Sequence, residues 1–120
     1  MASIHCIGAG LVGSYVACRL ADRGHDVHVH DMNPRPKVVG YPRVMIHHGD
    51  ALDHCEELNE YAEVDIVVNM LPGDIGKIAM NTLNEQGYRT VDLSFSDDTP
   101  DLHDEKARDW GTSILWDVGI

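Results

Sequence analysis

Three glycines near the amino terminus are spaced as Gly8-x-Gly10-x-x-Gly13, and they follow a short apolar segment. Glycines at this spacing allow a tight turn and let an anion approach main-chain N–H groups, because no side chain occupies the space. The residues that follow have the periodicity of a helix, whose N-terminus carries free N–H groups and the positive end of the helix dipole. The turn, including Leu11 and Val12, is therefore predicted to bind a pyrophosphate.

An acid closes the second predicted strand. Asp31 can accept hydrogen bonds from the hydroxyls of an adenosine ribose, and its charge repels a 2′-phosphate. With the glycine turn, it predicts a nicotinamide dinucleotide as the cofactor and favours NAD. NADP stays open, because Arg35 and Lys37 follow Asp31 within six residues and could pair with a 2′-phosphate.

Apolar segments of strand length alternate along the chain with segments of helical periodicity. We expect strands at residues 3–8, 26–30, 44–48, 64–71, 89–95 and 113–118, and helices at 11–24, 50–63, 74–87 and 99–110. This alternation predicts a parallel sheet with right-handed crossovers. The expected fold is α/β, a Rossmann doubly wound parallel six-stranded sheet in the order 3-2-1-4-5-6, with one domain over residues 1–120.

The ends of the other strands supply further candidates, because ligands of such a sheet bind beyond the carboxyl ends of the strands. Asp50 follows the third strand. It could hydrogen-bond the adenine amino group or cap the next helix, and both roles stay open. Asn69, Leu71 and Pro72 end the fourth strand, on the path from pyrophosphate to nicotinamide, and Ser94 ends the fifth.

Composition and charge narrow the class of protein. The 120 residues are 43% hydrophobic and carry a net charge of −11, which argues against general binding to nucleic acid or to anionic membranes. No apolar run approaches the roughly 18–20 residues of a membrane span, and no signal peptide is recognised at the start, so a cytoplasmic protein is expected.

The eight histidines invite a metal hypothesis, which the spacing does not support. His28 and His30 share one face of a strand, whereas the adjacent His47 and His48 point to opposite faces. No set of histidines and cysteines has the spacing of a zinc site, so we expect no metal and assign the histidines to the sheet and the surface.

Several segments together resemble the N-terminal cofactor domain of the saccharopine dehydrogenase family: the glycine turn with Asp31, and residues 67–73, 91–95 and 116–119. The resemblance implies an oxidoreductase acting on CH–NH bonds of amino acids or related amines, with NAD or NADP as hydride carrier. It implies cofactor-binding roles for Gly8, Gly10, Leu11, Val12, Gly13, Asp31, Asn69, Leu71 and Pro72, and more weakly for Ser94 and Asp117.

Members of that family continue into a second domain that binds the substrate and completes the active site. We therefore expect these residues to form the cofactor domain of a longer enzyme, whose catalytic residues, amine substrate pocket and any homodimer interface lie beyond them. The alternative is a stand-alone regulatory NAD-sensing domain, which would carry the same turn and acid. Residues 69–73 and 91–95 favour the enzyme.

Overall fold

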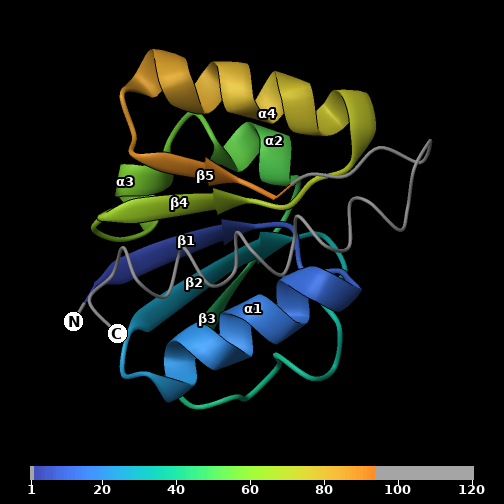
Figure 1. Ribbon diagram of the computed structural model, residues 1–120, viewed down its shortest axis with the longest axis vertical. Coiled ribbons are helices and arrows are strands. Elements are labelled where there is room, and N and C mark those ends of the chain that lie inside the picture. Colours follow the sequence, from blue (N-terminus) through green and yellow to red (C-terminus); the bar gives the residue numbers. More distant parts are fainter. Residues whose placement is uncertain (1, 94–120) are drawn as a thin grey trace.

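Five strands form a single parallel sheet in the computed structural model, which describes residues 2–93 (Figure 1). The strands are β1 (Ser3–Ile7), β2 (Asp26–Asp31), β3 (Val44–His48), β4 (Ile66–Asn69) and β5 (Thr90–Asp92). Their order is β3-β2-β1-β4-β5, and every neighbouring pair is parallel. The predicted α/β fold and strand order are confirmed for these five strands. The predicted sixth strand and the helix before it lie outside the described residues.

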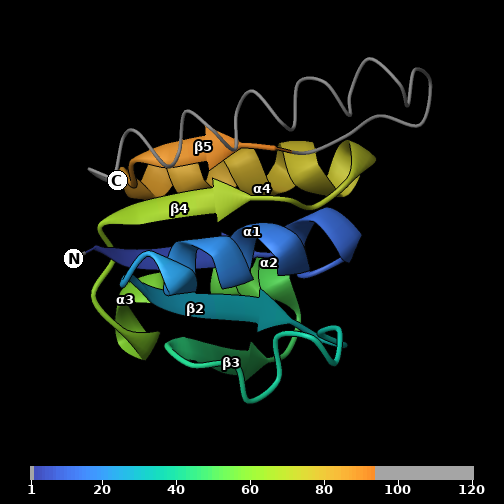
Figure 2. The same ribbon diagram turned by 60° about the horizontal axis from the view of Figure 1, so that its bottom comes forward.

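The helices cover both faces of the sheet. α1 (Leu11–Asp22) lies on one face, and α2 (Ala51–His54), α3 (Leu58–Tyr61) and α4 (Gly73–Gln86) lie on the other (Figure 2). α4 ends as the sequence predicts, because Gly87 takes the left-handed conformation (φ 80°) that stops a helix. No helix within residues 2–93 is both long and apolar enough to cross a bilayer.

The single helix predicted over residues 50–63 is wrong, because the chain forms α2 and α3 with a break between them. At and just past the end of α2, the hydrogen bonds become those of a 3₁₀ helix, in which an N–H donates to the carbonyl three residues earlier. Cys55 N donates to Leu52 O, and Glu57 N donates to His54 O. Glu57 then leaves the helical region, with φ −143° and ψ 34°. Ala51, Cys55 and Leu58, which have the spacing of one helix face, are nevertheless all buried. Ala62, the fourth residue at this spacing, is half-buried, so the apolar spacing survives the break only in part.

The two faces of the sheet are packed differently. On the α1 face, the alternate strand residues Ile4, Cys6, Val27 and Val29 join one apolar core. On the opposite face, a second apolar core forms around Ile7, Ala51, Cys55, Leu58, Val67, Ala79 and Leu83. This second core lies under β1 and β4, and histidines fill the same face toward β3.

Candidate functional site

The carboxyl end of β1 runs into the glycine turn and then into α1. Gly8 has a φ of +93°, and its N–H donates to His30 O at 2.9 Å. A Cβ on Gly8 would lie 3.2 Å from Leu71 Cδ2, against the segment that follows β4. Gly8 therefore permits the tight turn that the spacing predicts, since both the backbone conformation and the close neighbour disfavour a side chain.

Gly13 serves the packing of α1 on this turn. A Cβ on Gly13 would lie 3.0 Å from Gly8 O, closer than a side chain tolerates without movement of the backbone. The buried Ser14 hydroxyl also donates to Ala9 O at 2.9 Å. The helix and the turn are thus held as one unit.

Gly10 differs from the other two glycines because it faces open space. No heavy atom lies within 4 Å of the position of a Cβ on Gly10. Gly10 is the N-cap of α1, no side chain caps this helix, and its first turn contains no acid. The N–H groups of Leu11, Val12 and Gly13 have no carbonyl partner within the helix, because helix N-termini leave them free. The turn therefore presents donors at an exposed edge, with no side chain at Gly10 to block them, which suits an anion.

Asp31 lies beside this turn, as the sequence predicts. Its Oδ2 accepts from Ala9 N at 2.7 Å, and its Oδ1 accepts from Asn33 N at 2.7 Å. Each carboxylate oxygen has a second lone pair, and the residue is partly exposed, so Asp31 keeps the capacity to accept from a ligand hydroxyl. The structure adds a second task, because the same carboxylate ties the glycine turn to the end of β2.

The end of β4 and the segment after it contain three of the candidate residues, Asn69, Leu71 and Pro72. Asn69 is fully buried; its Nδ2 donates to Gly76 O at 2.9 Å, and its Oδ1 accepts from Leu71 N at 3.2 Å. Asn69 therefore shapes the connection from β4 to α4. Leu71 lies against Gly8, and the exposed Pro72 is the N-cap of α4.

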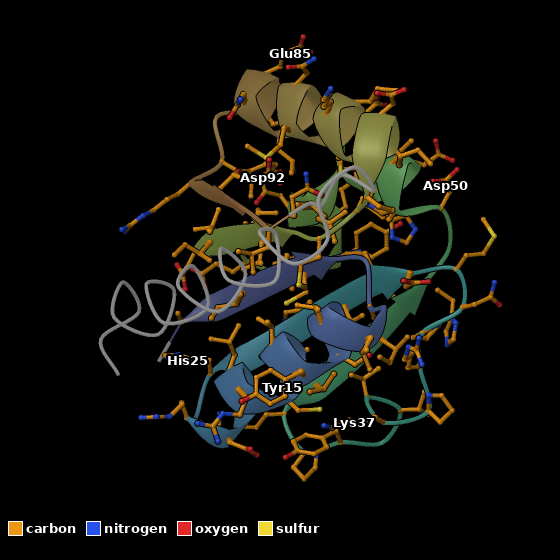
Figure 3. All side chains as sticks on the ribbon, turned by 45° about the vertical axis from the view of Figure 1, so that its right-hand side comes forward. Tyr15, His25, Lys37, Asp50, Glu85 and Asp92 are labelled. Carbon is orange, nitrogen blue, oxygen red and sulfur yellow. The ribbon has the colours of Figure 1, made fainter. Side chains whose placement is uncertain are left out.

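Asp50 lies at the carboxyl end of β3 and is exposed (Figure 3). Its Oδ1 accepts from Leu52 N at 3.0 Å, so it caps α2, which is one of the two roles left open above. The preceding Gly49 N–H donates to Asp31 O at 3.3 Å, which connects this strand end to the acid of β2. Ser94 and Asp117 lie outside the described residues.

The loop between β2 and β3 carries the two cations that could meet a 2′-phosphate. Arg35 and Lys37 are both exposed. Lys37 Nζ lies 5.6 Å from the centre of the Tyr15 ring on α1, and Figure 3 shows both residues on the α1 side of the molecule. The buried Val38 anchors the loop in the α1-face core, so these cations belong to a fixed segment.

The histidines form a cluster that the sequence analysis missed. His5, His47 and His54 join His28 and His30 on the face covered by α2 and α3. Burial lowers the pKa of His5 to about 4 and that of His30 to about 2, with further lowering from neighbouring histidines. The available signal was the alternation of His28 and His30 in β2, flanked by strands that each carry histidine as well.

The other groups suited to chemistry are buried or dispersed. The three cysteines are free and buried, and burial raises the pKa of Cys6 and of Cys55 to about 12, so neither is a reactive thiolate. Among the described side chains, no group of three or more histidines, cysteines, aspartates or glutamates is arranged to hold a metal ion.

Comparisons with known proteins agree with this geometry. Residues 4–114 match the family model of the saccharopine dehydrogenase NADP-binding domain. A solved structure described as an F420-dependent NADP reductase, from Arthrobacter sp. FB24, has a TM-score of 0.57 and 23% identity over 78% of this chain. The chain spans less than half of that protein, because the match covers 45% of it. A search of curated proteins gives no significant match.

Proposed function

Because the chain belongs to the saccharopine dehydrogenase NADP-binding domain family, we propose that it binds NADP at the carboxyl edge of its sheet. The observation that carries this proposal is the open space in front of Gly10, with the free donors of α1 on one side and Asp31 beside it. In the proposed pose, the pyrophosphate lies against the turn and the adenosine ribose lies at Asp31.

The choice of NADP rests on the family and on the loop after β2. The matched family model is that of an NADP-binding domain, which favours NADP over the NAD that Asp31 alone suggested. Both oxygens of Asp31 already accept backbone N–H bonds, which offsets part of its repulsion of a phosphate. Arg35 and Lys37 then supply the positive charge for the 2′-phosphate.

The proposed biochemical role is that of the cofactor domain of an oxidoreductase acting on CH–NH bonds of amino acids or related amines. NADP would supply the hydride acceptor or donor. The residues of this chain bind and orient it: the turn holds the pyrophosphate, and the segment of Leu71 and Pro72 borders the path toward the nicotinamide. The buried Asn69 positions that segment by accepting a hydrogen bond from Leu71 N. Substrate contacts and proton transfer are assigned to a further domain of the full protein.

The direct test is calorimetric titration of the 120-residue chain with NADP⁺ and with NAD⁺. We expect NADP⁺ to bind more tightly. In Gly10→Val the side chain enters space that is empty in the folded protein, so the variant should fold and lose binding by roughly a hundredfold or more, because it occupies the pyrophosphate position. Failure of the folded wild-type chain to bind either dinucleotide would contradict the proposal.

The specificity is tested by Arg35→Ala/Lys37→Ala. Loss of two charge-assisted contacts should weaken NADP⁺ roughly tenfold or more and leave NAD⁺ unchanged. Lys77→Ala is the matched control, because Lys77 is an exposed cation on α4 whose side chain is 81% accessible. An equal loss for both dinucleotides in the double variant, or an equal loss in the control, would contradict the assignment of the 2′-phosphate to this loop.

A further inference from the structure

Five histidines from four elements lie together beneath the edge where the adenosine is proposed to bind. His5 comes from β1, His28 and His30 from β2, His47 from β3 and His54 from α2. The parallel register places His5 beside His28 and His30 beside His47. None of His5, His28, His30 and His54 exceeds 8% exposure. An ordinary sheet of this kind would have aliphatic residues at these positions.

The rings are packed face to face across the strands. The distances between ring centres are 4.7 Å for His5–His28, 5.0 Å for His5–His30, 5.2 Å for His28–His47 and 4.8 Å for His30–His47. Tyr61 on α3 closes the cluster, with its ring centre 4.6 Å from that of His54. Two cationic rings at these distances would repel each other strongly in a buried environment.

A chain of hydrogen bonds fixes the tautomers of three of these histidines. His5 Nε2 lies 2.9 Å from Glu63 O, which can only accept, so Nε2 carries the proton and Nδ1 accepts. His30 Nε2, at 2.8 Å, therefore donates to His5 Nδ1, and His30 Nδ1 accepts. His54 Nδ1, at 2.9 Å, must then be the donor to His30. The pattern is complete when all three rings are neutral.

Additional protons disturb this arrangement. A proton on His30 leaves two donors facing each other at His54 unless His54 changes its tautomer, and a second proton on the chain places charge on adjacent rings. His28 and His47 form a second pair, with Nδ1 and Nε2 3.0 Å apart. Burial lowers the pKa of both residues, and repulsion between them lowers that of His47 further.

The charged and titratable groups around the cluster come from each element that packs against it. Besides the five histidines, they are Tyr61 on α3, with Asp53, Glu57 and Glu60 near it, and Asp26 at the start of β2. The acids lie on the outer side, near Tyr61 and His28. They do not neutralise the innermost ring, His30, whose pKa is lowered by burial and by four neighbouring histidines.

The cluster is connected directly to the proposed adenosine site. His30 immediately precedes Asp31, and His54 ends the short helix that Asp50 caps. A Cβ on Gly49 would lie 2.6 Å from His54 Nε2, so the end of β3 is fitted closely to this ring. Asp50 caps α2 and the neighbouring Gly49 N–H donates to Asp31 O, so α2 is linked to both strand ends.

We propose that this imidazole cluster is a proton-binding site and that proton uptake by it opposes binding of the dinucleotide. The coupling rests on the proposed function, because it concerns the affinity of that same site. The packed rings exclude protons, but when α2 moves away from β2 and β3 the rings reach solvent and take up protons, and the edge that receives the adenosine is displaced. By reciprocity, a bound dinucleotide makes the cluster harder to protonate.

The test compares the dissociation constant for NADP⁺ at about pH 7.5 and about pH 5.0, by calorimetry, in wild type and variants. The ligand's own 2′-phosphate titrates between these pH values but contributes equally in every protein. The change in dissociation constant between the two pH values, compared between wild type and variants, therefore isolates the contribution of the cluster. His54→Asn keeps a donor toward His30 and removes one ring from the cluster. His30→Leu/His54→Leu removes the link entirely, and either variant suffices if the other fails to fold.

Wild-type affinity should fall roughly threefold or more over this range beyond the change seen in the variants. The control is His25→Asn, which removes a buried imidazole and keeps an acceptor for the Ala2 N–H. His25 precedes β2, so it lies at the amino ends of the strands, away from Asp50 at the carboxyl end of β3 (Figure 3). This variant should keep the full wild-type pH dependence. The same pH dependence in wild type, His54→Asn and the double variant would overturn the proposal.

Failure of the two proposals can be told apart. If folded wild type does not bind NADP⁺ at about pH 7.5, the proposed function and the coupling both fall. The thermal midpoints without ligand still judge the proton site: wild type should lose several degrees more than His30→Leu/His54→Leu on acidification. Equal losses would contradict the proton site itself.

Discussion

The two faces of the sheet carry different chemistry on the same strands. On the α1 face, β1 and β2 contribute Ile4, Cys6, Val27 and Val29, and the buried groups have no charge to gain or lose near neutral pH. On the other face, the alternate residues of β2 are His28 and His30, joined by three further histidines. Both faces are buried, so burial alone does not determine how the stability of a face responds to pH.

The two faces are therefore expected to contribute to the stability of the fold in different ways. The α1 face owes its stability to apolar contacts, which change little with pH. The histidine face depends on neutral rings, so its stability is conditional on pH. It is this conditional face that supports α2 and the strand ends around Asp31 and Asp50. The predictions below test whether the two faces behave as differently as their residues indicate.

The largest effect is expected from a cavity on the apolar face. Leu20 of α1 is 1% exposed, and Leu20→Ala should lower the free energy of unfolding by about 2–5 kcal/mol. The loss should be the same at neutral and at acidic pH, because no titrating group is removed. Urea unfolding monitored by circular dichroism measures this loss of stability. A loss that changes markedly with pH would contradict the proposed difference between the two faces.

Acid should weaken the wild-type protein through the histidine face. The folded-state pKa of His5 is about 4 and that of His30 about 2, against 6.5 for the unfolded chain. Because the unfolded state binds protons first, stability is full above about pH 6.5 and falls as the pH drops toward 4 for His5 and toward 2 for His30. Each ring removes at most about 1.4 kcal/mol per pH unit. Unfolding curves at several pH values test this, and constant stability down to about pH 5 would contradict it.

Gly49→Ala should destabilise the protein by disturbing the packing of His54 against the end of β3. Gly49 has a φ of +147° and a Cβ there would meet His54 Nε2 at 2.6 Å, so the variant combines backbone strain with a clash and should cost about 1–3 kcal/mol. Gly40→Ala is the matched control, because Gly40 also has a positive φ (+77°) but has no heavy atom within 4 Å of its Cβ position. Equal losses of stability in the two variants would show that the contact with His54 is unimportant.

The smallest effect is expected at the cap of α2. Asp50→Ala removes the acceptor for Leu52 N and should cost about 1 kcal/mol, whereas Asp50→Asn keeps an acceptor and should cost less. Thermal unfolding of both variants measures the difference. If alanine and asparagine behave alike, the hydrogen bond of Asp50 does not hold α2 on the histidine face.

Local patterns predicted the glycine turn and the elements around it, because these are encoded by short segments. The glycine spacing predicted a tight turn with space for an anion, and the alternation of segments predicted the order of the five described strands. The break between α2 and α3 escaped prediction, because the apolar spacing of Ala51, Cys55 and Leu58 continues across it.

The histidine cluster escaped prediction for a different reason. Its members come from segments far apart in the sequence, and each strand alone has an ordinary pattern. Only the register, which pairs His5 with His28 and His30 with His47, brings the rings together. The ties that Asp31 makes to Ala9 and Asn33 are likewise set by the tertiary structure.

The central claim is that a dinucleotide binds at the turn of residues 8–13 and at Asp31, and amide chemical-shift mapping of the ¹⁵N-labelled chain tests it most directly. On addition of NADP⁺ at neutral pH, the largest saturable shifts should occur at Gly8, Gly10, Leu11, Val12, Gly13 and Asp31. The amides near His25, at the opposite edge of the sheet, should stay unchanged. Saturable shifts that avoid residues 8–13, or no shifts in the folded protein, would contradict the account.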